Sequence, residues 1–169
     1  MKRSENMIYE DWKKEYEKFV LTKKYSEATS AVGRCFANPS IENIKIAYGL
    51  VQDYVSSIPL PMNNKGEKRK EFLGKLDEIA LILYGTESDE VKKICEKYKV
   101  KRGKIRNGIS VVDTIIDAPN LIIAIRDLLI EAGEYATSLG LRVTMSPERK
   151  FGLKRILEEE GFLEDEENE

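Results

Sequence analysis

The sequence contains no histidine among its 169 residues, and this absence excludes a large part of enzyme chemistry. Histidine is the usual general base near neutral pH and the commonest metal ligand in proteins. Catalysis by Ser-His-Asp or Cys-His groups is therefore unavailable to this chain. No other catalytic constellation stands out, so we expect a protein that is not an enzyme, with no catalytic residue, no metal site and no cofactor.

Cysteine is scarce as well, with Cys35 and Cys95 as its only occurrences. Both lie in apolar helical patterns, and neither has a second cysteine nearby that would complete a metal knuckle. A disulfide between them requires that the fold bring them together. Two buried free thiols are the commoner outcome, and the sequence leaves the pairing open.

Long apolar runs are also missing. No apolar run approaches twenty residues, which is the length that a membrane-spanning helix needs. The N-terminal stretch MKRSENMIYEDW is too polar for a signal peptide. We therefore expect a cytoplasmic protein without a membrane partner.

Glutamine occurs once, as Gln52, whereas charged residues are abundant. Lysine outnumbers arginine by 19 to 9, and glutamate outnumbers aspartate by 22 to 8. Enrichment in Lys and Glu with few thermolabile amides is typical of hyperthermophile proteins, whose surface ion pairs cost less to desolvate at high temperature. The composition favours a thermophilic origin, in an archaeon or an archaeal virus.

Helical periodicity dominates the chain. Apolar residues recur at steps of three and four, and they predict separate helices over residues 8–20, 25–36, 41–58, 67–84, 91–98, 121–139 and 147–160. Asn38-Pro39, the loop 58–67, Gly85 and Gly140 separate them. We predict an all-α fold, an irregular bundle of seven to eight helices in one domain over residues 1–157. Within this domain, the predicted helices of residues 1–85 could form a sub-bundle of their own.

Two segments are less clear. Valine and isoleucine alternate loosely with charges in KYKVKRGKIR, residues 97–106, so at most one small β-hairpin is expected there, turning at Arg102-Gly103. Residues 109–117 are rich in β-branched side chains, and they fit a strand or a short helix equally well. Leu121 to Leu139 is apolar nearly all round, which predicts the central buried helix.

The basic stretch from Lys92 to Arg106 holds eight cationic residues and one acid, Glu96. Phosphate contacts need several Lys or Arg on one face, because each neutralised phosphate releases counterions, and an exposed tyrosine can stack on a base. The pattern predicts a site for DNA or RNA. It comprises Lys92, Lys93, Lys97, Tyr98, Lys99, Lys101, Arg102, Lys104 and Arg106.

The alternative is an exposed, lysine-rich connector between two helices. Two further basic clusters would extend a nucleic-acid site if they shared its face. They consist of Lys65, Lys68, Arg69 and Lys70, and of Arg149, Lys150, Lys154 and Arg155.

Residues 158–169 hold eight acids and no base. The whole chain has 28 basic and 30 acidic residues, so residues 1–157 have 28 basic and 22 acidic residues and a net charge of +6. This acidic tail is a solubility segment, a competitor of nucleic acid for the basic body, or a docking segment for a partner. The predicted partner-binding residues are Phe162, Leu163, Glu164, Asp165, Glu166 and Glu167.

Pairs of carboxylates allow a less favoured alternative, a magnesium-dependent nucleotide hydrolase. Glu131 and Glu134 have the Glu-x-x-Glu spacing that holds Mg²⁺ in helical hydrolases, but the second pair, Asp77-Glu78, is adjacent. Arg126 lies in the most apolar region, where we expect it to pair with Asp113 or Asp117.

These observations predict a small non-enzymatic accessory or adaptor protein of a nucleic-acid-handling protein complex. It would contact nucleic acid through the basic stretch, with the acidic tail modulating that contact or docking a partner. A protein–protein interaction module without nucleic-acid binding is the alternative, and a magnesium-dependent nucleotide hydrolase is the less favoured one.

Overall fold

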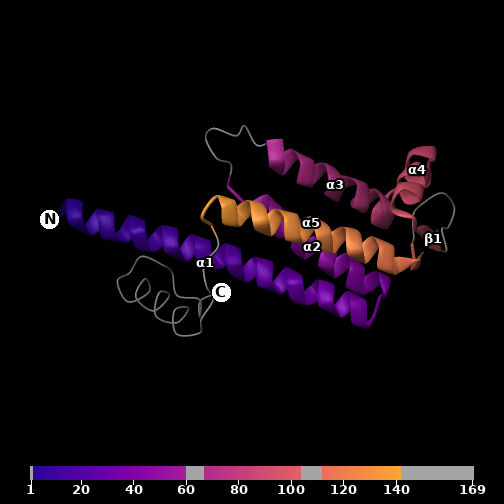
Figure 1. The fold of residues 1–169 in the computed structure, drawn as a ribbon, viewed down its shortest axis with the longest axis horizontal. Coiled ribbons are helices and arrows are strands. Elements are labelled where there is room, and N and C mark those ends of the chain that lie inside the picture. Colours follow the sequence, from indigo (N-terminus) through magenta and orange to yellow (C-terminus); the bar gives the residue numbers. More distant parts are fainter. Residues whose placement is uncertain (1, 60–66, 104–111, 142–169) are drawn as a thin grey trace.

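A computed structural model of the chain describes the backbone of residues 2–59, 67–103 and 112–141, and the side chains of these residues from Lys13 onward. The described residues form five α-helices and one two-stranded antiparallel sheet (Figure 1). The predicted helical class is confirmed. The predicted number of seven to eight helices is wrong for the described residues, and the expected helix over 147–160 lies outside them.

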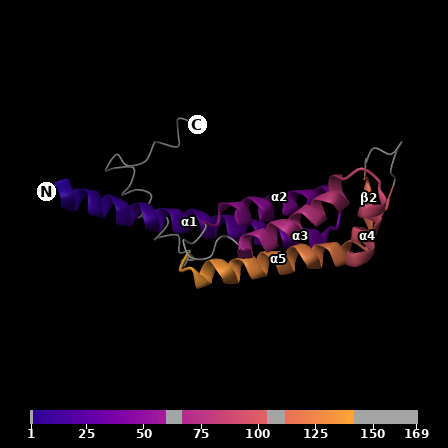
Figure 2. The same ribbon diagram turned by 90° about the horizontal axis from the view of Figure 1, so that it is seen from above.

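The first helix, α1 (Lys2–Ala37), covers both of the first two predicted helices. No proline or glycine lies between Val20 and Tyr25, so nothing stops the helix there. At 1.5 Å per residue its 36 residues span about 54 Å. Its N-terminal part extends beyond the other helices in both views (Figures 1 and 2).

Helix α2 (Ile41–Ser57) packs along α1 after a short turn. Ser40 is its N-cap, and the Ser40 hydroxyl accepts a hydrogen bond from the amide of Asn43 at 3.1 Å. The inward face of α2 includes Ile44, Val51 and Tyr54, which are at most 1 % exposed.

Helix α3 (Glu67–Tyr84) is followed by a four-residue turn and by the short helix α4 (Asp89–Tyr98). Ser88 caps α4 through a hydrogen bond from the amide of Val91. Gly85 separates the two helices, as predicted, without a left-handed backbone, since the positive φ angles among the described residues lie at Lys99, Asp117 and Gly140. Gly85 is required for another reason: a Cβ there would lie 2.5 Å from the carbonyl oxygen of Leu81.

A two-stranded sheet connects α4 to the last helix. Strand β1 (Lys101–Gly103) pairs with strand β2 (Thr114–Ile116), with Arg102 opposite Ile115. One small antiparallel sheet is therefore present, but the hairpin predicted within residues 97–106 is wrong, because Arg102 and Gly103 lie inside β1 and the partner strand is Thr114–Ile116. Of the ambiguous segment 109–117, residues 114–116 are a strand, while 109–111 lie outside the described residues.

Helix α5 (Ala118–Ser138) contacts all four other helices. Leu121, Ile125 and Ala132 lie on its buried face. Ile123 and Ile130 are 38 % and 41 % exposed, so this helix is not enclosed on all sides as predicted. The two exposed isoleucines lie on the outside of the bundle, with the exposed ion pair of Arg126 and Asp127 between them.

The buried side chains form one hydrophobic cluster that extends from Leu21 in α1 to Ala136 in α5. None of the described helices combines the length and the low charge that crossing a membrane requires. Seen from above, the four long helices run along a common direction, and α4 and β2 lie together at one end (Figure 2).

Candidate nucleic-acid interface

The predicted nucleic-acid site lies at the end of the bundle formed by α4 and the β1–β2 sheet, away from the N-terminus of α1 (Figure 1). Helix α4 is amphipathic: Val91, Ile94 and Cys95 are buried, and Lys93 and Glu96 are exposed. Packing of the buried face fixes which lysines face solvent. The basic stretch is thus divided by the fold into residues that support the bundle and residues that are free to bind.

Helices α3 and α4 form a helix–turn–helix unit. Residues 85–88 make a four-residue turn that begins with glycine and ends with the Ser88 cap, which matches the turn length of DNA-binding helix–turn–helix motifs. The axis of α4 turns away from that of α3, and the second helix is presented at the end of the molecule (Figure 1). We did not predict this unit from the sequence, although the sequence shows that only a short turn separates the two predicted helices.

Arg102 belongs to the supporting residues. Its side chain is 2 % exposed, and its guanidinium donates hydrogen bonds to the carbonyl oxygens of Leu81 and Gly85 and to the Glu87 carboxylate, at 3.2 Å. These acceptors lie at the C-terminal end of α3 and in the turn that follows. Arg102 therefore fastens β1 to the helix–turn–helix unit, and its charge is already neutralised.

Tyr98 and Lys97 are also engaged. The Tyr98 hydroxyl donates to a carboxylate oxygen of Glu78 at 3.1 Å, and the Lys97 ammonium lies 2.8 Å from the other oxygen. Burial, and then the charge and hydrogen bond of Glu78, raise the pKa of Tyr98 to about 12. Its ring is half-buried, so it is not presented as a flat stacking surface for a base.

Lys92, Lys99 and Lys101 remain available. They border a hollow of about 480 Å³ between α4, β1 and the start of α5, and all three side chains are exposed. None of them forms an ion pair with another residue in the described part of the chain. Glu96 and Asp117 also border this hollow, so the three lysines outnumber the carboxylates that are not already paired.

Lys93 is exposed on the outward face of α4 and likewise forms no ion pair with a described residue. Lys104 and Arg106 follow β1 directly but lie outside the described residues, as does the predicted partner-binding segment from Phe162 to Glu167.

The second basic cluster does not extend this site. Lys68, Arg69 and Lys70 lie in the first turn of α3, which is about 25 Å from its other end at 1.5 Å per residue. Arg69 donates to the carbonyl oxygen of Ser56 at 2.9 Å. Lys65 and the cluster from Arg149 to Arg155 lie outside the described residues.

The candidate metal-binding carboxylates do not converge. Glu131 forms an ion pair with Lys75 at 3.2 Å, and the described residues contain no group of three or more potential metal ligands. Arg126 pairs with its neighbour Asp127 and lies over the ring of Phe36. Our prediction that it pairs with Asp113 or Asp117 was wrong, because its side chain faces solvent on α5.

Both cysteines are buried and free. Cys35 donates to the carbonyl oxygen of Asn43 at 3.1 Å, which ties α1 to the start of α2. Burial raises the pKa of both thiols. They act as small core residues.

No protein-family model matches the chain, and no curated protein or solved structure is similar to it.

Proposed function

We propose that this protein is a non-enzymatic accessory protein of a nucleic-acid-handling complex, and that it binds nucleic acid through the hollow bordered by Lys92, Lys99 and Lys101. The observation that carries the proposal is that these three exposed lysines surround one hollow without ion-pair partners among the described residues. Ammonium groups held in this way bind phosphates as point charges.

The charge distribution on α4 indicates how the contact is made. In helix–turn–helix proteins the N-terminal residues of the second helix contact base edges in the major groove. Here that position carries Asp89 and Glu90, which repel phosphates. Contact through Lys92, through Lys99 at the C-cap of α4 and through Lys101 in β1 therefore fits backbone phosphates, and we infer binding with little sequence preference.

The number of lysines sets the expected salt dependence. Three phosphate contacts give a slope of log K against log salt of about −2.7 on duplex DNA. Between 50 and 200 mM salt the affinity should then fall about 40-fold. A much steeper slope would require contributions from other parts of the chain.

Fluorescence anisotropy with labelled single-stranded and double-stranded oligonucleotides tests the proposal over this salt range. The triple variant Lys92→Glu, Lys99→Glu, Lys101→Glu should lose binding at 50 mM salt. The matched control Lys13→Glu, Lys23→Glu, Lys70→Glu has the same change in net charge at exposed positions away from α4 and should keep most of it. Equal loss in both variants, or no binding by the unmodified chain at 50 mM salt, would contradict the proposal.

A protein-interaction module is the second candidate, and the outer face of α5 favours it. Ile123 and Ile130 lie seven residues apart on α5 and are 38 % and 41 % exposed, and exposed apolar groups on one face mark interaction surfaces. Sedimentation of the unmodified chain and of the variant Ile123→Lys, Ile130→Lys tests whether a second copy covers this face. A dimer that the variant dissociates would support this candidate.

A further inference from the structure

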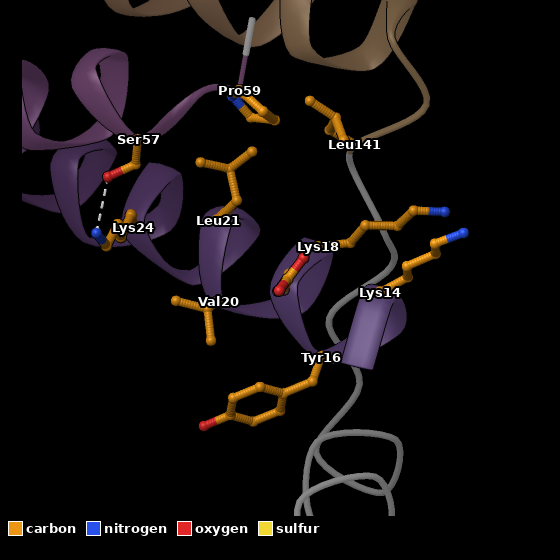
Figure 3. A pocket seen from close by; sticks show the side chains of 10 residues that line it. Lys14, Tyr16, Lys18, Val20, Leu21, Lys24, Ser57, Pro59 and Leu141 are labelled. Carbon is orange, nitrogen blue, oxygen red and sulfur yellow. Dashed lines mark hydrogen bonds between the residues drawn. The ribbon is translucent and has the colours of Figure 1, made fainter. Parts of the chain in front are cut away.

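A second hollow, of about 590 Å³, lies at the opposite end of the bundle from α4. It is formed by the middle of α1, by Ser57 and Pro59 at the end of α2, and by Leu141, three residues after α5. Figure 3 shows Leu21, Pro59 and Leu141 gathered around it, with Val20 and Tyr16 further along α1. Its wall is mainly apolar, and Val20 is half-exposed there.

The position of Leu141 connects this groove to the rest of the chain. Leu141 is both part of the wall and the last residue that the structure describes, and 28 residues follow it. Ser146-Pro147 predicts a helix start, and Leu153, Ile156 and Leu157 follow at helical spacing, on one stripe. The five residues 142–146 span at most about 17 Å, so a helix starting at Pro147 begins close to the groove.

Charge complements this apolar match. Lys14, Lys18 and Lys24 line the groove together with one acid, Glu17, and Lys14 and Lys18 extend outward from it (Figure 3). Lys18 and Lys24 pair with Glu15 and Asp53 at 3.5 and 3.3 Å, whereas Lys14 forms no ion pair with another described residue. The residues after the predicted helix carry the eight acids of the tail. A helix laid in the groove would bring these acids near a lysine-rich part of α1.

We propose that residues 147–163 of the same chain dock in this groove, with Leu153, Ile156 and Leu157 against Val20, Leu21 and Pro59. Tethering makes the contact intramolecular and so raises the effective concentration of the segment. The proposal does not rest on nucleic-acid binding. It implies that the acidic tail is held at the end of the bundle away from Lys92, Lys99 and Lys101, since α5 alone spans about 30 Å.

Disulfide trapping in the full-length chain tests the contact directly. Val20→Cys is combined in turn with Leu153→Cys, Ile156→Cys and Leu157→Cys, and each double variant is mildly oxidised. Because a disulfide requires Cα atoms within about 7 Å, at least one pair should form an intramolecular bond, identified by non-reducing electrophoresis and peptide mass spectrometry. The control replaces Val20→Cys by Lys93→Cys on α4, which should not react.

Hydrogen–deuterium exchange of the full-length chain gives a second readout. Amides of residues 147–157 should exchange at least about tenfold faster in Val20→Glu than in the unmodified chain. Ser26→Glu, at an exposed position of the same helix, has the same charge change and should leave this exchange rate unchanged.

Fast exchange of residues 147–157 in the unmodified chain, together with no trapped pair, would overturn the proposal. Intermolecular disulfides and protection that rises with protein concentration would overturn it as well, because they would show that the segment occupies the groove of a second copy.

Discussion

Replacing Arg102 by methionine separates a structural role of this residue from a nucleic-acid contact. Methionine keeps much of the aliphatic volume but removes the guanidinium. In Arg102→Met the carbonyl oxygen of Gly85 loses its charged donor, the carbonyl oxygen of Leu81 keeps only the amide of Gly85, and the Glu87 carboxylate is left unpaired. All three acceptors lie at the C-terminal end of α3 and in the turn that connects it to α4.

The size of the effect follows from burial. Removing one partner of a buried ion pair costs about 3–5 kcal/mol. The Arg102 side chain is 2 % exposed, but that of Glu87 is 29 % exposed, so water can solvate part of the orphaned carboxylate. We therefore expect the free energy of unfolding to fall by about 3 kcal/mol. For a chain of this length that lowers the Tm by about 6–12 °C.

Urea denaturation followed by far-ultraviolet circular dichroism measures this difference. Lys101→Met is the matched control, because Lys101 is the neighbour of Arg102 in β1 and its side chain is exposed; it should change stability by at most about 0.5 kcal/mol. Oligonucleotide affinity should show the reverse order: Lys101→Met should weaken binding more than Arg102→Met does. An Arg102→Met variant of nearly unchanged stability that no longer binds oligonucleotides would refute the structural role.

Two further outcomes are expected. Gly133→Ala should destabilise the chain by about 1–3 kcal/mol, since its Cβ would lie 2.5 Å from the ring of Tyr25. Gly74→Ala places its Cβ in open space and should stabilise the chain by about 0.5–1 kcal/mol. Equal effects of the two substitutions in urea denaturation would contradict this packing. Burial raises the pKa of the Cys35 and Cys95 thiols, so both should hold less reactive thiolate at pH 8 than a free cysteine does. Both should therefore react slowly with Ellman's reagent until denaturant is added. Rapid labelling of either thiol in the folded chain would contradict their burial.

The two hollows lie at opposite ends of the bundle and differ in character. One is bordered by lysines on α4 and β1, and the other has a mainly apolar wall at the end of α5. A protein with separate ends of this kind can hold nucleic acid at one end and its own acidic segment at the other. Under the two proposals, the tail would not need to leave its groove before nucleic acid binds.

Local signals predicted the helices well where they end in a clear cap or stop. Ser40 and Ser88 cap α2 and α4, and Glu67–Tyr84 has the predicted bounds. The prediction was wrong at α1, where separate helices over 8–20 and 25–36 were expected and one helix, Lys2–Ala37, is found. Nothing between Val20 and Tyr25 opposes helix continuation, and tertiary packing along α2 and α5 supports one long helix.

The basic stretch shows the same division between local and long-range information. Its lysines and arginines were evident from the sequence, but their roles depend on residues that are distant along the chain. Lys97 and Tyr98 meet Glu78, which lies about twenty positions earlier. Only folding of α4 against α3 brings these groups together.

By itself, the sequence determined that this protein is a helical bundle with a basic body, because helical periodicity, capping residues and net charge are local or additive properties. Tertiary structure alone decided which cations are free. Arg102 was indistinguishable from Lys101 in the sequence, yet strand pairing turns it toward the end of α3, where backbone carbonyls and Glu87 neutralise it. Its neighbour stays in solvent because successive side chains of a strand point to opposite faces.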